Sequence, residues 1–107
     1  MPERPGLQPG VDVEEEVKLA PNHHVILLND DDHTYEYVVE MLGKIFGYGV
    51  EKAFGMARTV DTAGRVVVWT GALETAEFKR DQIHAYGADW RIPRCAGSMS
   101  AIVEAAE

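Results

Sequence analysis

The amino-acid sequence predicts a small α+β domain, a three-stranded antiparallel sheet with three helices on one face, in the order β-α-α-β-α-β. Two short runs rich in branched apolar residues, 25–28 and 65–70, are typical of strands. Three other segments repeat apolar residues at helical spacing. The 107 residues, 46% of them hydrophobic, can build one core and one shallow site, but not the two-lobed cleft of many cofactor enzymes. A protein that is not an enzyme and needs no cofactor is therefore favoured.

Residues 1–22 are predicted to be a flexible N-terminal arm, and residues 23–107 to be the folded domain. The arm contains four of the five prolines and the acidic run Glu14-Glu15-Glu16, and nothing in it is periodic. It is either a solvated tail or a segment that helps docking or delivery. The first residues lack the basic start and apolar core of a signal peptide, and no apolar run reaches the roughly 18 residues of a membrane span. A cytoplasmic location is therefore expected.

The first strand, at 25–28, is a continuous apolar run, as expected for a strand at the centre of a sheet. It ends at a polar turn in which Thr34 or Asp32 can cap the following helix. Along that helix the apolar residues lie three or four positions apart, at Val38, Met41, Leu42 and Ile45. The two glycines of the run Gly47-Tyr48-Gly49 end it.

The rest of the chain alternates between helix and strand. A second helix carries the stripe Val50, Ala53, Phe54 and Ala57, and it ends before Gly64, which can take the positive φ of a turn. The run 65–70 is the clearest strand. A third helix is expected over about 72–86. A last strand is expected at 98–103, with Met99, Ala101 and Val103 on its buried face.

The formal net charge of −8, from 18 acidic and 10 basic residues, limits the class of partner. It argues against DNA or RNA, because phosphate binding needs a basic face. It suits a cationic ligand or a protein with basic patches. The single cysteine, Cys95, excludes an internal disulfide, and the absence of a CxxC motif gives no sign of a zinc site, which fits a reducing compartment.

The densest functional signal is the run Asn29-Asp30-Asp31-Asp32-His33, between a buried strand and a helix. Three interpretations stay open. The run is a capped turn with solvated acids, or a metal site, although the alternating Asp pattern of a calcium loop is missing. The third is capture of an organic cation. The α-ammonium group of a polypeptide is largely protonated at pH 7 and donates three hydrogen bonds, which Asn and Asp side chains can accept.

These residues also resemble the signature LLNDDxxxxEFVxxxL of the ClpS adaptor family. The matching runs are 27–31, Leu-Leu-Asn-Asp-Asp, and 36–42, Glu-Tyr-Val-Val-Glu-Met-Leu. The similarity continues through Val60-Asp61 and 64–67 and through Glu74, Glu77 and Lys79, and it reaches Tyr86 without a gap. It includes the last strand after an insertion near 90–97.

The resemblance implies an adaptor that binds proteins whose N-terminal residue is bulky and hydrophobic (an N-degron) and delivers them to a Clp AAA+ unfoldase and its protease. It implies that Asn29 and Asp30 bind the α-amino group, with Asp31 beside them. It also implies a side-chain pocket lined by Leu27, Leu28, Tyr35, Val38, Ala57, Val60 and Met99. Glu74 and Lys79 match positions that contact the N-terminal domain of a ClpA- or ClpC-like unfoldase; otherwise they belong to an exposed charged helix face. The alternative is a ClpS-like regulator of the unfoldase without N-terminal recognition.

Four positions depart from the family's usual pattern. Asp61 replaces a histidine, Tyr35 replaces a methionine, Ala57 replaces a larger apolar residue, and His33 replaces a small hydroxyl residue at the rim of the pocket. Together these changes reshape the pocket. We hypothesise that the carboxylate of Asp61 strengthens the attraction to the ammonium group and makes binding more sensitive to salt.

Overall fold

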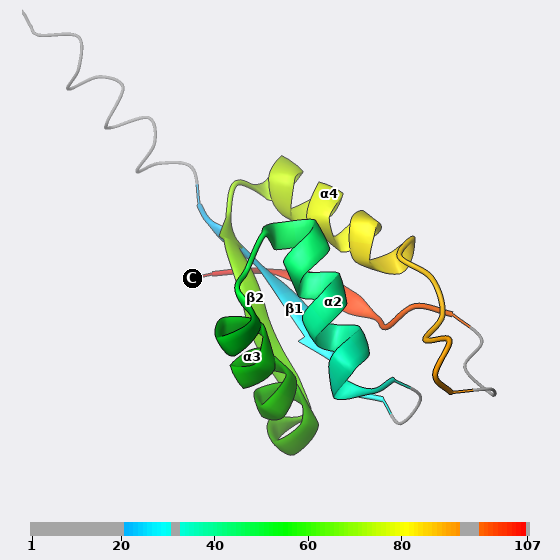
Figure 1. The fold of residues 1–107 in the computed structure, drawn as a ribbon. Coiled ribbons are helices and arrows are strands. Elements are labelled where there is room, and N and C mark those ends of the chain that lie inside the picture. The colour runs from blue at the N-terminus through cyan, green and yellow to red at the C-terminus, as the bar shows by residue number, and fades with distance from the viewer. Residues whose placement is uncertain (1–20, 31–32, 93–96, 107) are drawn as a thin grey trace, which may run out of the picture.

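The computed structural model describes residues 21–30, 33–92 and 97–106 (Figure 1). Its sheet has three strands, β1 (His23–Leu28), β2 (Arg65–Gly71) and β3 (Ala101–Ala105), in the order β2-β1-β3. Both neighbouring pairs are antiparallel. The continuous apolar run of β1 fits this arrangement, because a central strand has no free edge and its residues Val25, Ile26 and Leu27 are all buried.

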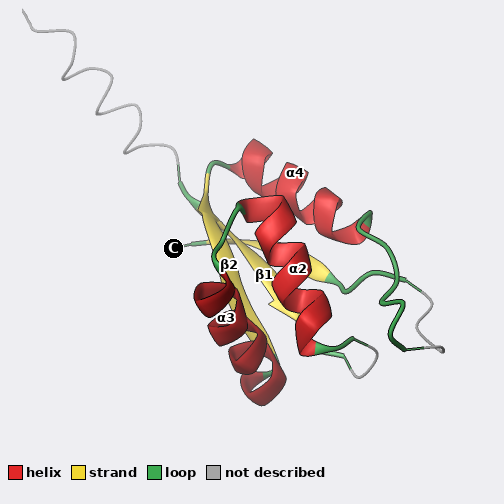
Figure 2. Ribbon diagram, in the orientation of Figure 1, coloured by secondary structure: helices red, strands yellow, loops and turns green. Residues whose placement is uncertain are grey.

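Three helices cover one face of the sheet: α2 (Tyr35–Phe46), α3 (Val50–Ala63) and α4 (Leu73–His84) (Figure 2). Together with the strands they give the predicted order and the predicted fold class, which the structure confirms. The core lies between the helices and the sheet. Its buried residues are Val25, Leu27, Tyr37, Val38, Met41, Leu42, Ala53, Ala57, Val60, Val68, Ala76, Ile83, Met99 and Ala101.

The stripe predicted for α3 is only half buried. Ala53 and Ala57 are buried in the core, but Val50 is 70% exposed and Phe54 is 39% exposed. Alanines at the contact let α3 pack closely against its neighbours. The two larger side chains therefore lie at the edge of that contact, where they take part in a surface hollow described below.

The last strand begins three residues later than predicted, at Ala101 rather than 98. The predicted alternation of side chains holds for Met99 and Ala101, which are both buried, but Val103 is only half-buried, as is its neighbour Ile102. The ladder between β1 and β3 ends at the pair Leu27 and Ala101. Beyond this pair, one backbone hydrogen bond connects the two segments, from Leu28 N to the carbonyl of Ser100 (3.0 Å). The third helix is also shorter than predicted: it ends at His84, shortly before Gly87, whose φ of +111° is not helical.

The predicted arm, residues 1–22, lies outside the described residues except for its last two. The carbonyl of Asn22 accepts a hydrogen bond from Ala106 N (2.9 Å), so the chain already contacts the end of β3 just before β1 begins. The role of the arm stays a prediction.

A buried carboxylate, Asp89, fixes the loop that follows α4 to the start of α2. It is 1% exposed, and it accepts hydrogen bonds from the backbone N and the hydroxyl of Thr34, at 2.7 and 2.9 Å. Thr34 is in turn the N-cap of α2, because its hydroxyl oxygen accepts from Tyr37 N. Arg91 donates to Asp89 from its backbone N and its guanidinium group, both at 3.1 Å. Burial alone would raise the pKa of Asp89, but these hydrogen bonds lower it from 3.8 to about 2.

Asp89→Asn should lower the free energy of unfolding by about 2 kcal/mol at pH 7, because an amide cannot reproduce the carboxylate's acceptance of these donors. The folded-state pKa is lower than the ordinary value. The contribution of the Asp89 carboxylate to the free energy of unfolding is therefore complete above about pH 4 and is lost as the pH falls toward 2. Urea unfolding at pH 7 and at pH 3 measures both effects.

The matched control is Asp81→Asn, since the Asp81 side chain is 66% exposed and pairs with its neighbour Arg80. This control should change stability by less than about 0.5 kcal/mol. Identical urea midpoints for wild type and Asp89→Asn at pH 7 would show that Asp89 does not fasten the loop.

Candidate functional site

The end of β1 brings the polar turn next to two other parts of the chain. Leu28 N donates to the carbonyl of Ser100, and Asn29 N donates to the carbonyl of Gly64, each at 3.0 Å. Gly64 has a φ of +86°, which allows the chain to turn sharply from α3 into β2. As a result, Asn29 and Asp30 lie beside the end of α3 and the segment that precedes β3.

A small cavity of about 30 Å³ lies at this junction. That is space for one or two water molecules and is far below the roughly 300–1,000 Å³ typical of small-molecule pockets. Nine of the predicted site residues line it, namely Asn29, Asp30, His33, Tyr35, Val38, Ala57, Val60, Asp61 and Met99, together with Thr34. Its apolar walls are buried, whereas Asn29, Asp30 and Asp61 are exposed at its mouth.

Two predicted pocket residues that the structure describes, Leu27 and Leu28, are not among those that line the cavity. Leu27 is fully buried within the core, and Leu28 is half-buried at the end of β1. Asp31 lies outside the described residues. The predicted partner residues Glu74 and Lys79 are on α4, which contributes nothing to the lining of the cavity.

His33 holds the carboxylate of Asp30 in place. Its Nδ1 is 2.7 Å from Asp30 Oδ1, and its Nε2 is 2.7 Å from the carbonyl oxygen of Gly97. The ring thus bridges the carboxylate of Asp30 and the carbonyl group of Gly97. The ring also packs against Tyr37, with the centroids 4.5 Å apart. The side chain is therefore part of the wall of the site, where it connects two segments far apart in the sequence.

Tyr35 closes the opposite side of the mouth. Its hydroxyl group donates to Asp61 Oδ2 at 2.7 Å, which bridges the first residue of α2 to the last turn of α3. Its ring packs edge-on against Phe54, with the centroids 5.3 Å apart. The hydrogen bond to Asp61 raises the pKa of the Tyr35 phenol above 10.0, assisted by burial and by the negative charge of Asp61. The phenol therefore stays protonated, and stays a donor, at physiological pH.

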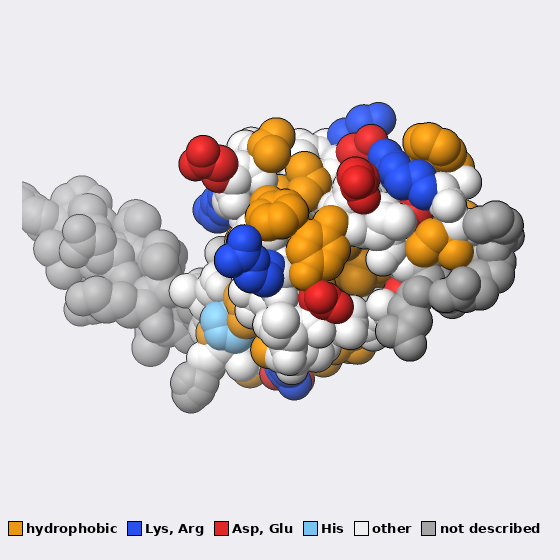
Figure 3. Space-filling model, turned by 60° about the horizontal axis from the view of Figure 1, so that its bottom comes forward, with side chains coloured by type: hydrophobic (Ala, Val, Ile, Leu, Met, Phe, Trp, Pro, Cys, Tyr) orange, Lys and Arg blue, Asp and Glu red, His pale blue; other side chains and the backbone are white. Residues whose placement is uncertain are grey.

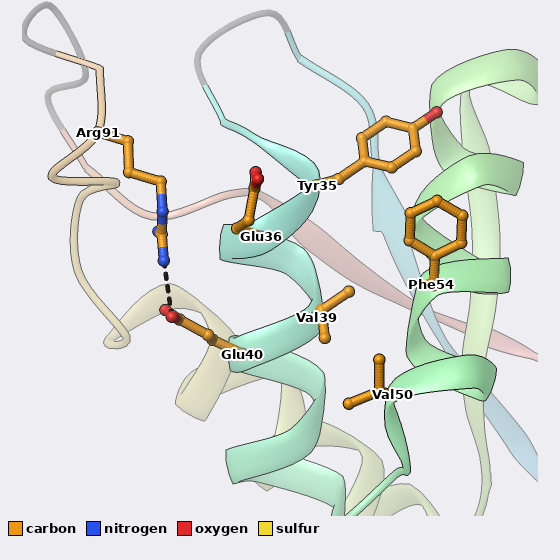
Figure 4. Close-up of a pocket in the computed structure, with 7 residues that line it drawn as sticks. All are labelled: Tyr35, Glu36, Val39, Glu40, Val50, Phe54 and Arg91. Carbon is orange, nitrogen blue, oxygen red and sulfur yellow. Dashed lines mark hydrogen bonds and ion pairs between the residues drawn. The ribbon is translucent and has the colours of Figure 1, made fainter.

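A second, larger hollow of about 320 Å³ lies between α2 and α3 on the other side of Tyr35 (Figure 4). It is lined by Tyr35, Glu36, Val39, Glu40, Val50, Phe54 and Arg91. Glu40 is already paired with Arg91, whose Nη2 donates to Glu40 Oε2 at 2.6 Å. At this end of the molecule, hydrophobic side chains form a cluster bordered by acidic and basic ones (Figure 3). Tyr35 is the one residue that lines both hollows.

Neither a metal centre nor a membrane span is found in the part of the chain that the structure describes. Within residues 21–30, 33–92 and 97–106, no group of three or more His, Cys, Asp or Glu side chains is placed to hold a metal ion. Among the same residues, no helix has both the length and the apolar character needed to cross a membrane. The metal interpretation of the acidic turn therefore gains no support from the residues described.

Sequence reasoning missed the larger hollow and the role of Asp89. The sequence signal for the hollow was present, since Val50 and Phe54 belong to a predicted helical stripe, but a stripe does not say which of its members the neighbouring helix covers. Asp89 follows a predicted helix in a polar loop, and nothing in its neighbourhood marks it as buried.

Comparison with known proteins gives the class to which this architecture belongs. The family model described as "ATP-dependent Clp protease adaptor protein ClpS" matches residues 18–91. A ClpS adapter from Nostoc sp. is 38% identical over 71 residues, which cover 65% of this chain and 73% of the relative. One from Erwinia tasmaniensis is 35% identical over 77 residues, covering 72% and 73%. The chain belongs to the ClpS family of adaptors of the ATP-dependent Clp protease, a family of adaptors rather than enzymes.

A solved structure shows the same fold. It is Agrobacterium tumefaciens ClpS2 bound to L-phenylalaninamide, with a TM-score of 0.69 and 23% sequence identity. The match covers 80% of this chain and 98% of ClpS2. The resemblance inferred from the sequence motif is thereby confirmed at the level of the family and the fold.

The hydrogen bond between Tyr35 and Asp61 predicts a measurable change in titration. In Asp61→Ala the acceptor and its charge are both lost, so the pKa of Tyr35 should fall back toward 10.0. Tyr48 is an internal control, because its pKa is raised by burial alone and should not change. Titration of the tyrosine ring carbons by NMR measures both groups in one sample. An unchanged pKa for Tyr35 would mean that the hydrogen bond is not formed in solution.

Proposed function

We propose that this protein binds the free α-amino group and the bulky hydrophobic side chain of the first residue of a substrate protein, and delivers that substrate to a Clp unfoldase and its protease. The observation that carries the proposal is the cavity at the end of β1. Exposed Asn29, Asp30 and Asp61 surround its mouth, and buried Val38 and Met99 are among its walls.

The polar mouth suits an ammonium group. The α-amino group has a pKa near 7.7–8.0 and is mostly charged at pH 7, with three N–H donors to satisfy. One amide oxygen and two carboxylates can accept these donors. Each charge-assisted hydrogen bond of this kind contributes roughly 1.5–3 kcal/mol. Because His33 orients the carboxylate of Asp30, that side chain loses little conformational freedom when the ligand binds.

The apolar walls suit a large hydrophobic side chain, once the cavity widens. Burial of a Leu or Phe side chain contributes about 1.5–3 kcal/mol. The small side chain of Ala57 leaves room on the α3 side of the cavity, whereas the ring of Tyr35 restricts it on the α2 side. The ligand of the ClpS2 structure supports this assignment, because L-phenylalaninamide has a free α-amino group and a benzyl side chain.

We place the contact with the unfoldase's N-terminal domain on α4. Glu74 is exposed in the first turn of that helix. Lys79 is partly used within the molecule, since its Nζ donates to the carbonyl of Ile45 at 2.8 Å and lies 5.4 Å from the centroid of the Phe46 ring. Of the two predicted partner residues, Glu74 is thus the one whose charge is presented outward. Exposed Phe78, 60% accessible on the same helix, offers an apolar contact beside it.

The first experiment compares a short peptide that begins with Phe and its N-acetylated form. Acetylation removes the ammonium charge, so the acetylated peptide should bind roughly 10- to 100-fold more weakly in fluorescence anisotropy. With a Clp unfoldase and its peptidase present, a protein that begins with Phe should be degraded and its acetylated form should not. Equal affinity for the two peptides would favour the alternative, a ClpS-like regulator of the unfoldase without N-terminal recognition.

The second experiment tests the charge of Asp61. Asp61→Asn keeps the size and a hydrogen-bond acceptor but removes the negative charge, so the affinity for the peptide should fall less steeply as the salt concentration rises. Asp81→Asn removes the same charge from an exposed position on α4, away from the cavity, and should keep the salt dependence of wild type. An Asp61→Asn protein with unchanged affinity and unchanged salt dependence would exclude a role for this carboxylate in holding the ammonium group.

A further inference from the structure

Resting on the proposed function, we infer that Tyr35 is a latch whose hydroxyl group occupies Asp61 until the α-ammonium group of the substrate displaces it. Tyr35 would thereby set how tightly any N-terminal residue binds. The inference concerns one hydrogen bond, between the Tyr35 hydroxyl and Asp61 Oδ2, at 2.7 Å.

The two side chains face each other across the mouth of the cavity. Tyr35 is the first residue of α2 and Asp61 is near the end of α3, and both line the cavity. Their hydrogen bond therefore spans the entrance between the two helices. The lone pair of Oδ2 that accepts from Tyr35 is not available to an ammonium donor while the latch is closed.

The size of the cavity requires such a movement. At about 30 Å³ it does not accept a Leu or Phe side chain, so a wall has to move before the ligand enters. Three of the apolar walls, Val38, Ala57 and Val60, are buried in the core and are fixed by packing. Tyr35 is half-buried and is held from the side by one hydrogen bond and by an edge-on contact with Phe54. Among the wall residues, Tyr35 is therefore the one that moves most readily.

The larger hollow gives the ring room to move. It lies on the other side of Tyr35, and its apolar lining includes Val39, Val50 and Phe54. In Figure 4 the hydroxyl group of Tyr35 points away from Val39 and Val50, so the ring can turn from Asp61 toward them without leaving apolar surroundings. The open position thus loses the hydrogen bond but keeps a hydrophobic environment for the ring.

The exchange favours a charged ligand. The phenol already donates to a charged acceptor, and an ammonium group that replaces it adds the attraction between opposite charges to the hydrogen bond that Asp61 accepts. A neutral N-terminus opens the latch without this compensation. The apparent affinity of every ligand is reduced by the fraction of molecules in which the latch is closed, so removal of the latch should raise affinity.

The test measures the affinity of a C-terminally labelled peptide beginning with Phe for five proteins: wild type, Tyr35→Phe, Tyr48→Phe, Asp61→Ala and the double variant of Tyr35→Phe with Asp61→Ala. Tyr35→Phe keeps the ring and removes only the hydroxyl group, and it should bind roughly two- to tenfold more tightly than wild type. Tyr48→Phe is the matched control. It also loses a hydroxyl group that donates a hydrogen bond, to the carbonyl of Val68 at 2.6 Å, but it does not line the cavity and should bind like wild type.

The double variant tests whether the gain acts through Asp61. In the Asp61→Ala background the latch has no acceptor, so adding Tyr35→Phe should change the affinity little. A gain of the same size in that background would overturn the inference, as would a Tyr35→Phe protein that binds the peptide no more tightly than wild type. If wild type prefers the free peptide to its acetylated form while Tyr35→Phe shows no gain, the latch is wrong and the proposed function stands. If wild type shows no such preference, both are wrong.

Discussion

Strand β1 is hydrogen-bonded along both edges, to β2 and to β3, and the position of its last residues determines where the polar turn lies. Leu28 and Asn29 continue the backbone pairing to Ser100 on one side and Gly64 on the other. A peptide group that is bonded on both sides cannot shift along its neighbours without breaking both bonds. The candidate site is therefore attached to the most constrained element of the fold, although its polar groups are exposed.

The carboxylates of this site are not simply solvated charges. Asp30 is bonded to the ring of His33, and Asp61 accepts from the phenol of Tyr35. Each acid therefore has a donor supplied by α2 or the turn before it. The negative charge of the chain, −8 in total, is locally organised here into two directed acceptors on either side of one opening. This arrangement supports the proposed binding of a cation more than a general excess of acidic residues would.

Sequence patterns predicted the fold well because each helix and strand has its own periodicity. The helix cap at Thr34 and the burial of Met99 were also predicted. Most of the candidate site followed from motif resemblance. What the sequence could not supply were contacts between distant residues. Leu27 was predicted to line the pocket, but it is fully buried in the same core cluster as Val38 and Ala57 and is not among the residues that line the cavity. Asp89 was missed because its burial depends on donors more than 50 residues away and on Arg91.

The loop after α4 has both of its described ends fastened to the region around the start of α2. On one side, Asp89 binds Thr34, and Arg91 binds Glu40. On the other, the carbonyl of Gly97 meets the ring of His33. With both ends anchored, the number of residues between them can change at little cost to the geometry of the cavity, because closing a longer loop adds only slowly to the entropy lost. A tag inserted between these two anchors is therefore expected to leave the cavity in place.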